Sequence, residues 1–179
     1  LPYVLKQVQA PIYCTRLTRA LIEYKLKERG IKQALINTIK PKDKVKIGCF
    51  EIEFIKTNHS ITGAVALAIH TPLGIIVHTG DFKVDYTPVD SEPIDLAKFA
   101  ELGNKGVLLL MADSTNVERE GYTMSERSVG EAFERYFIEG EGRRIIIATF
   151  ASNVHRIQQI VDLAEKQGRK VCFLGRSME

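Results

Sequence analysis

The chain has 179 residues, 45% of them hydrophobic and 26% charged, a balance typical of a soluble globular protein with one domain or with one domain and the start of a second. The sequence shows no apolar run near the roughly 18 residues of a membrane span and no signal peptide. A net charge of +3, spread along the chain, does not by itself indicate nucleic-acid binding. Three widely spaced cysteines without a CxxC pair argue against a disulfide framework or a zinc knuckle, and we expect buried thiols in a reducing cytoplasm.

Short apolar strands alternate with amphipathic helices, which predicts an α/β fold. The first part of the chain predicts the end of a helix over 2–9, a strand over 11–14, a helix from Thr15 to Gly30 and a strand over 34–39. Next, Phe50, Ile52 and Phe54 alternate with Glu51 and Glu53, which predicts a half-buried strand. A hairpin (64–69 and 74–79), a helix (95–102) and a buried apolar strand (106–111) follow.

The pattern changes after a polar stretch over 113–123. A helix from Ser125 to Phe137, a buried strand over 143–150, a helix capped by Ser152 and a strand over 170–174 are predicted. This β-α-β order favours a parallel sheet with a right-handed crossover. We therefore predict a domain boundary near residue 122, with domains over 1–122 and 123–179.

Two polar residues lie where strands end, which is where binding groups collect. His59 follows the strand that begins at Phe50, and Asp81 follows Gly80 at the end of another strand. A carboxylate there needs a positive partner, which is either a metal ion or, locally, Lys83. Two ligands do not make a catalytic zinc site, which usually has three protein ligands and a water. The other histidines, His70, His78 and His155, are interpreted as structural.

Several segments, taken in order, resemble the ribonuclease J family in the β-CASP branch of the metallo-β-lactamase superfamily. They cover essentially the whole chain: Leu1-Pro2-Tyr3-Val4-Leu5-Lys6, Thr57-Asn58-His59-Ser60-Ile61, His78-Thr79-Gly80-Asp81-Phe82-Lys83, Asp113-Ser114-Thr115-Asn116, Phe150-Ala151-Ser152-Asn153-Val154-His155-Arg156 and Gly175-Arg176-Ser177-Met178-Glu179. The resemblance implies part of a metallo-β-lactamase αββα sandwich over 1–122, followed by the start of a β-CASP α/β domain over 123–179.

The resemblance also implies roles for individual residues. His59 would be a ligand of one metal ion and Asp81 the carboxylate that bridges two. Asp113 would orient a metal-bound histidine or assist proton transfer. The RNA would be faced by the three residues that follow it, Ser114, Thr115 and Asn116. The implied cofactors are two divalent metal ions, zinc or alternatively manganese, which activate a water for attack on phosphorus.

The implied activity is 5′–3′ exo- and endoribonuclease action in RNA decay and maturation in the cytoplasm. The implied partners are an RNA substrate, further copies of the same protein in a dimer or tetramer, and other RNA-decay proteins, with no membrane. The family's HxHxDH motif would lie before Leu1 and its later histidine motifs beyond Glu179, so we expect an internal fragment that is inactive alone. Thr62-Gly63-Ala64 also replaces the expected Pro-Asp-Ser. The alternatives are a thioesterase-like hydrolase of the superfamily and a non-catalytic RNA-binding or scaffold piece.

Overall fold

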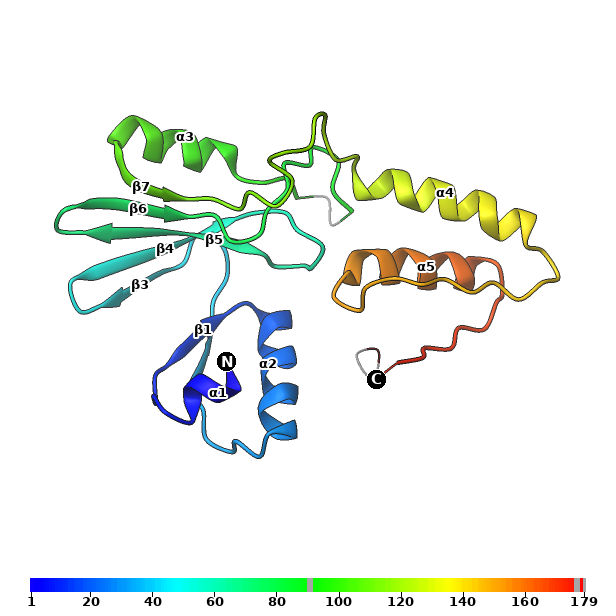
Figure 1. Cartoon of the computed structure of the whole chain (residues 1–179), viewed down its shortest axis with the longest axis horizontal. Coiled ribbons are helices and arrows are strands. Elements are labelled where there is room, and N and C mark those ends of the chain that lie inside the picture. The colour runs from blue at the N-terminus through cyan, green and yellow to red at the C-terminus, as the bar shows by residue number, and fades with distance from the viewer. Residues whose placement is uncertain (90–91, 176–177, 179) are drawn as a thin grey trace. The chain divides into compact units, whose positions relative to one another are not determined.

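The computed structural model describes residues 1–89, 92–175 and 178 (Figure 1). Its backbone contacts divide the chain into two compact units. Unit 1 comprises residues 1–57, 63–82 and 95–113, and unit 2 comprises residues 58–62, 83–94 and 114–179. The chain therefore leaves unit 1 twice for short excursions before it continues into the rest of unit 2. The predicted domain boundary near residue 122 remains a prediction.

A five-stranded sheet forms the larger part of unit 1, in the order β3-β4-β5-β6-β7. The first four strands form an antiparallel meander, and β7 runs parallel to β6. The predicted hairpin is confirmed, since β5 and β6 pair up to the Thr71–Gly74 turn. The strands are β3 (Lys44–Ile47), β4 (Phe50–Lys56), β5 (Val65–Thr71), β6 (Gly74–His78) and β7 (Val107–Met111).

Helix α3 (Leu96–Lys105) packs its apolar side on this sheet. Leu102, which is 1% exposed, sits in a cluster with four buried strand residues, Ile55, Ala66, Ala68 and Val77. The helix begins at Asp95, whose carboxylate accepts a hydrogen bond from Lys98 N at 3.0 Å, as expected of an N-cap. Burial of these side chains supplies the main stabilisation of the sheet.

The N-terminal part of unit 1 is a small α/β arrangement. Strands β1 (Ile12–Cys14) and β2 (Ile36–Thr38) pair in parallel and are connected through helix α2 (Arg16–Glu28). A short helix, α1 (Pro2–Leu5), precedes them. Arg19 on α2 donates to Thr38 Oγ1 at 3.1 Å and pairs with Glu23 one turn later at 2.8 Å, so α2 is tied to β2 by side-chain contacts.

Unit 2 contains two helices that run side by side, α4 (Glu126–Glu139) and α5 (Val154–Lys166) (Figure 1). Their shared core is formed by Phe137, Leu163 and Ala164, with Ile145 and Ile147 packed against it. The cap of α5 is Asn153 and not the predicted Ser152; the Asn153 carboxamide accepts from Arg156 N at 3.1 Å. Asn is as good an N-cap as Ser, so sequence alone could not choose between neighbours.

The two strands predicted in this unit are absent from its described part. Residues 143–150 alternate in burial from Ile145 to Phe150, as a strand does, but form no ladder with another strand. Residues 170–174 likewise carry no strand, so the predicted β-α-β crossover does not form within the described residues. A strand requires a hydrogen-bonded neighbour, which a local pattern cannot supply.

Two burial predictions are also wrong, those for β7 and for two of the three cysteines. Strand β7 is predicted to be buried, yet Leu108, Leu110 and Met111 are 48–61% exposed. On β4, which is predicted to be half-buried, Glu53 is 7% exposed. Cys14 is buried as predicted, whereas the other two cysteines, Cys49 and Cys172, are exposed, and all three are free thiols. The described residues form no helix long and apolar enough to cross a bilayer.

Candidate functional site

The loop that carries His59 follows directly from β4. Its backbone is fixed beside the predicted ligand, because Lys83 N donates to Asn58 O at 2.7 Å in an isolated antiparallel bridge. The Asn58 side chain, 6% exposed, donates to Glu92 O at 2.8 Å. His155 N on α5 donates to Ser60 O at 3.4 Å. This loop is therefore held on both sides of His59 by other segments of unit 2.

A cavity of about 210 Å³ in unit 2 opens against this loop. It brings His59 together with His155, whose structural interpretation from the sequence stays a prediction. The lining residues are Asn58, His59, Ser60, Lys83, Asp85, Pro88, Val89, Thr123, Glu126 and His155.

A buried carboxylate, Asp85, lies in the same wall and is 7% exposed. Thr87 N donates to its Oδ1 at 3.0 Å, and Ser125 Oγ donates to its Oδ2 at 2.9 Å. Burial alone would raise the pKa of Asp85, but the Thr87 and Ser125 hydrogen bonds, the Lys83 charge and the Glu126 backbone N–H together hold this pKa below its usual value. Asp85 is therefore an ionised residue that the sequence analysis missed.

Asp81 and Asp113 belong to unit 1, at the ends of neighbouring strands. Because β6 and β7 are parallel, the residues that follow them emerge at the same edge of the sheet. Thr79 joins the two ends: its N–H donates to Met111 O, and its Oγ1 accepts from Asp113 N, both at 3.0 Å. Gly80, just before Asp81, has a φ of +61°, a left-handed backbone conformation that glycine adopts without strain.

The predicted site residues are thus distributed over both units. Asp81 is exposed and Asp113 half-buried in unit 1, whereas half-buried His59 belongs to unit 2. Residues 114–116 are exposed in unit 2 at a turn where Val117 N donates to Ser114 O at 3.1 Å. His and Asp offer the nitrogen and oxygen donors that zinc accepts. The described residues nevertheless contain no group of three or more histidine, cysteine or acidic side chains that could hold a metal, so they supply at most part of such a centre.

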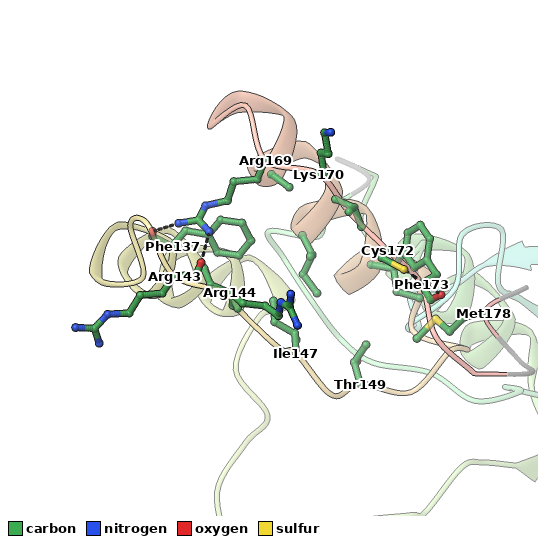
Figure 2. Close-up of a pocket in the computed structure, with 15 residues that line it drawn as sticks. Phe137, Arg143, Arg144, Ile147, Thr149, Arg169, Lys170, Cys172, Phe173 and Met178 are labelled. Atoms are coloured by element: carbon green, nitrogen blue, oxygen red, sulfur yellow. Dashed lines mark hydrogen bonds between the residues drawn. The ribbon is translucent and has the colours of Figure 1, made fainter.

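A second cavity of unit 2, about 390 Å³, is lined by residues of α4, α5 and the extended segments, and Figure 2 shows it. The Arg169 guanidinium lies 5.5 Å from the centre of the Phe137 ring and donates to Gly140 O at 2.7 Å and Arg143 O at 3.0 Å. Arg169 therefore binds the carbonyl end of α4, where a positive charge is favourable. It is interpreted as a structural residue.

Comparison with known proteins places this fold in a class. A crystal structure of a protein of unknown function from Enterococcus faecalis V583 matches with a TM-score of 0.67 at 21% identity, over 86% of this chain and 39% of that one, which shows the fold alone. The sequence-family model described as "Ribonuclease J, beta-CASP domain" matches residues 142–179 of this chain. The class is therefore the mixed α/β metallo-β-lactamase fold with a β-CASP domain.

The sequence matches are more extensive. The chain is 50% identical over 179 residues to ribonuclease J of Synechocystis sp. strain PCC 6803 (98% of this chain, 28% of that protein) and 45% identical over 186 residues to ribonuclease J of Thermus thermophilus (99% and 32%). It is 40% identical to ribonuclease J2 of Bacillus subtilis, in an alignment that covers 99% of this chain and 32% of that protein. The chain therefore belongs to the ribonuclease J family, as the motifs predicted, and spans about 28 to 32% of the length of these relatives.

Proposed function

We propose that the protein containing this chain is a metal-dependent ribonuclease that hydrolyses RNA phosphodiesters, with 5′–3′ exo- and endoribonuclease action. The observation that carries the proposal is the placement of Asp81 and Asp113 at the ends of neighbouring parallel strands, in a chain 40 to 50% identical to proteins named ribonuclease J. Acidic side chains gathered at one sheet edge suit the binding of divalent metal ions. RNA decay and maturation in the cytoplasm is the proposed process.

In this proposal His59 and Asp81 would be metal ligands, His59 for one ion and Asp81 for both. The ions, zinc or manganese, supply an activated water and stabilise negative charge. Further ligands are required, because the described residues do not gather three. Asp113, held through its backbone N–H by Thr79, keeps its carboxylate at the strand end and orients a neighbouring group or carries a proton.

The proposed RNA contacts are the exposed turn residues Ser114, Thr115 and Asn116, which follow Asp113 directly. Hydroxyl and amide groups of this kind commonly bind sugar and phosphate oxygens. Assembly into a dimer or tetramer and association with RNA-decay partners belong to the same proposal.

The test is made on the full-length protein. We expect about two metal ions per chain by elemental analysis and metal-dependent cleavage of a 5′-monophosphorylated RNA. His59→Ala and Asp81→Ala should each lower kcat/KM by well over a hundredfold, since even residues behind a metal ligand contribute about 10- to 100-fold. His70→Gln, on β5, is the control and should retain activity and metal content.

Two results would contradict the proposal: full activity of Asp81→Ala, or a full-length protein that hydrolyses a thioester and leaves RNA intact. The second result would instead support the thioesterase alternative. The isolated 179-residue chain should show no enzyme-like RNA cleavage under the same conditions, because the described residues do not complete a metal centre.

A further inference from the structure

Asp85 connects two segments of unit 2 that lie 40 residues apart in the sequence. Ser125, the residue before the first turn of α4, lies with its Oγ 2.9 Å from both Asp85 Oδ2 and Thr87 O. The same hydroxyl accepts from Arg127 N at 3.3 Å. Asp85 therefore sets where α4 begins with respect to residues 83–87, since an ionised carboxylate makes stronger hydrogen bonds than a neutral acceptor does.

Lys83 extends this connection to the loop of His59. Its Nζ donates to Met124 O and lies 4.0 Å from Asp85 Oδ2, so the side chain is held at the start of α4. Its backbone N–H donates to Asn58 O at 2.7 Å, one residue before His59. The same residue thus contacts the α4 start with its side chain and the metal-ligand loop with its backbone.

Other contacts fix the loop from the opposite side. His155 N, in the first turn of α5, donates to Ser60 O. Arg156 in turn makes two hydrogen bonds to the Glu126 carboxylate, at 2.7 and 3.2 Å, and so joins the first turns of α5 and α4. The starts of both helices therefore converge on the segment Asn58–Ser60.

We propose that Asp85 is a positioning residue for the proposed ribonuclease, which fixes the loop of His59 on the start of α4 through Ser125 and Lys83. This inference rests on the proposed function for its catalytic consequence. Its structural content, the placement of the loop, can be measured without metal or RNA. Substitution of a group that orients a metal ligand typically lowers metal affinity or activity by about 10- to 100-fold.

The experiment compares Asp85→Ala with Asp95→Ala in the full-length protein. Asp95 is a matched control, because its carboxylate also accepts from a helix N-terminus, at Lys98 N, but Asp95 belongs to unit 1, whereas the His59 loop belongs to unit 2. Asp85→Asn keeps one oxygen that accepts from Thr87 N, and its amide nitrogen can donate to Ser125 Oγ while that hydroxyl donates to Thr87 O, so this variant should rescue most of the defect. All variants are compared at a temperature below the lowest melting temperature among them. Differences between them then report local changes at the loop and not global unfolding.

The first measurement is hydrogen exchange of the metal-free protein. In Asp85→Ala, the amides of Lys83 and His155, which donate to the loop, should exchange about tenfold faster, whereas in Asp95→Ala they should exchange as in the wild type. The second is the zinc dissociation constant by competition with a chromogenic chelator. It should rise about 10- to 100-fold in Asp85→Ala only, with kcat reduced more than KM is changed.

Unchanged exchange of these two amides in Asp85→Ala, or equal acceleration in both variants, would overturn the positioning role. Faster exchange throughout the protein, including the β5 amides, would also overturn it by showing general destabilisation. Failure of the proposed function is a separate result: the wild type then binds no metal and leaves RNA intact, while the exchange measurement still decides whether Asp85 positions the loop.

Discussion

Glu53 shows at the scale of a residue how unit 1 accommodates a charge in its interior. Its side chain is 9% exposed, with Lys98 Nζ 3.0 Å away and Lys44 Nζ 3.8 Å away. His70 Nε2 is also 3.8 Å from the carboxylate, too far for a hydrogen bond. A buried carboxylate without a partner costs several kcal/mol, so Lys98, the nearest cation, is the residue that makes burial of Glu53 tolerable.

Lys98→Ala should lower the free energy of unfolding by about 2 to 3 kcal/mol, somewhat less than loss of a partner in a fully buried pair, because Lys44 remains near Glu53. Lys105→Ala is the control. Lys105, like Lys98, pairs with Glu101, but this pair lies at the surface, so the substitution should lower the free energy of unfolding by about 0.5 kcal/mol or less. Urea unfolding measures both. Equal effects of the two substitutions would show that the Lys98–Glu53 contact is not a buried ion pair in solution.

The same pair determines a pH dependence. The hydrogen bond to Glu53 raises the pKa of Lys98 above 10.5; burial opposes this shift, and Glu101 adds to it. Because the folded-state pKa is the higher one, this stabilisation is complete below pH 10.5 and is lost as the pH rises through the folded value. The difference in stability between the wild type and Lys98→Ala should therefore be constant near neutrality and shrink only in strong alkali.

The local elements were largely predictable from the sequence, because turns and helix caps depend on neighbouring residues. The hairpin of β5 and β6 follows from its turn, and α3 follows from Asp95 and an apolar stripe. The predicted strands over 143–150 and 170–174 depend on a distant partner, and the burial of Glu53 depends on Lys98 of another element. A local sequence pattern therefore shows neither the partner of a strand nor the ion pair of a buried carboxylate.

The candidate site was predictable only in part for the same reason. The motifs led to His59, Asp81 and Asp113, and the parallel pairing of β6 and β7 brings the last two to one sheet edge. The contact between Asp85 and Ser125 joins residues 40 positions apart, in segments without a shared motif. Such contacts become visible only in the folded chain.

At the scale of an element, Arg169 holds the end of α4. Arg169→Lys should lower the stability of unit 2 by about 1 to 2 kcal/mol, because an ammonium group cannot reproduce the guanidinium's hydrogen bonds to three carbonyls and its stacking on Phe137. Arg135→Lys, at an exposed pair with Glu139, is the matched control and should be nearly neutral. Thermal unfolding followed by circular dichroism compares them, and equal melting temperatures would show that Arg169 is not a cap.

At the scale of the whole molecule, each unit has a hydrophobic core of its own. Leu102 belongs to the core of unit 1, and Phe137, which is 4% exposed, to that of unit 2. The segments 58–62 and 83–94 are flanked in the sequence by residues of unit 1, but they belong to unit 2. Loss of unit 2 should therefore release these two segments, and with them His59, while the sheet of unit 1 stays folded.

Phe137→Ala tests this division, since removal of a buried aromatic ring costs about 3 to 5 kcal/mol. Hydrogen exchange should accelerate in α4, in α5 and in the segments 58–62 and 83–94, and remain unchanged in β5 and β6. Leu102→Ala should do the reverse, with faster exchange in β4 to β6. If Phe137→Ala accelerated the β5 amides as much as those of α5, the two units would unfold as one cooperative body, and the loop of His59 would depend on the stability of the whole chain.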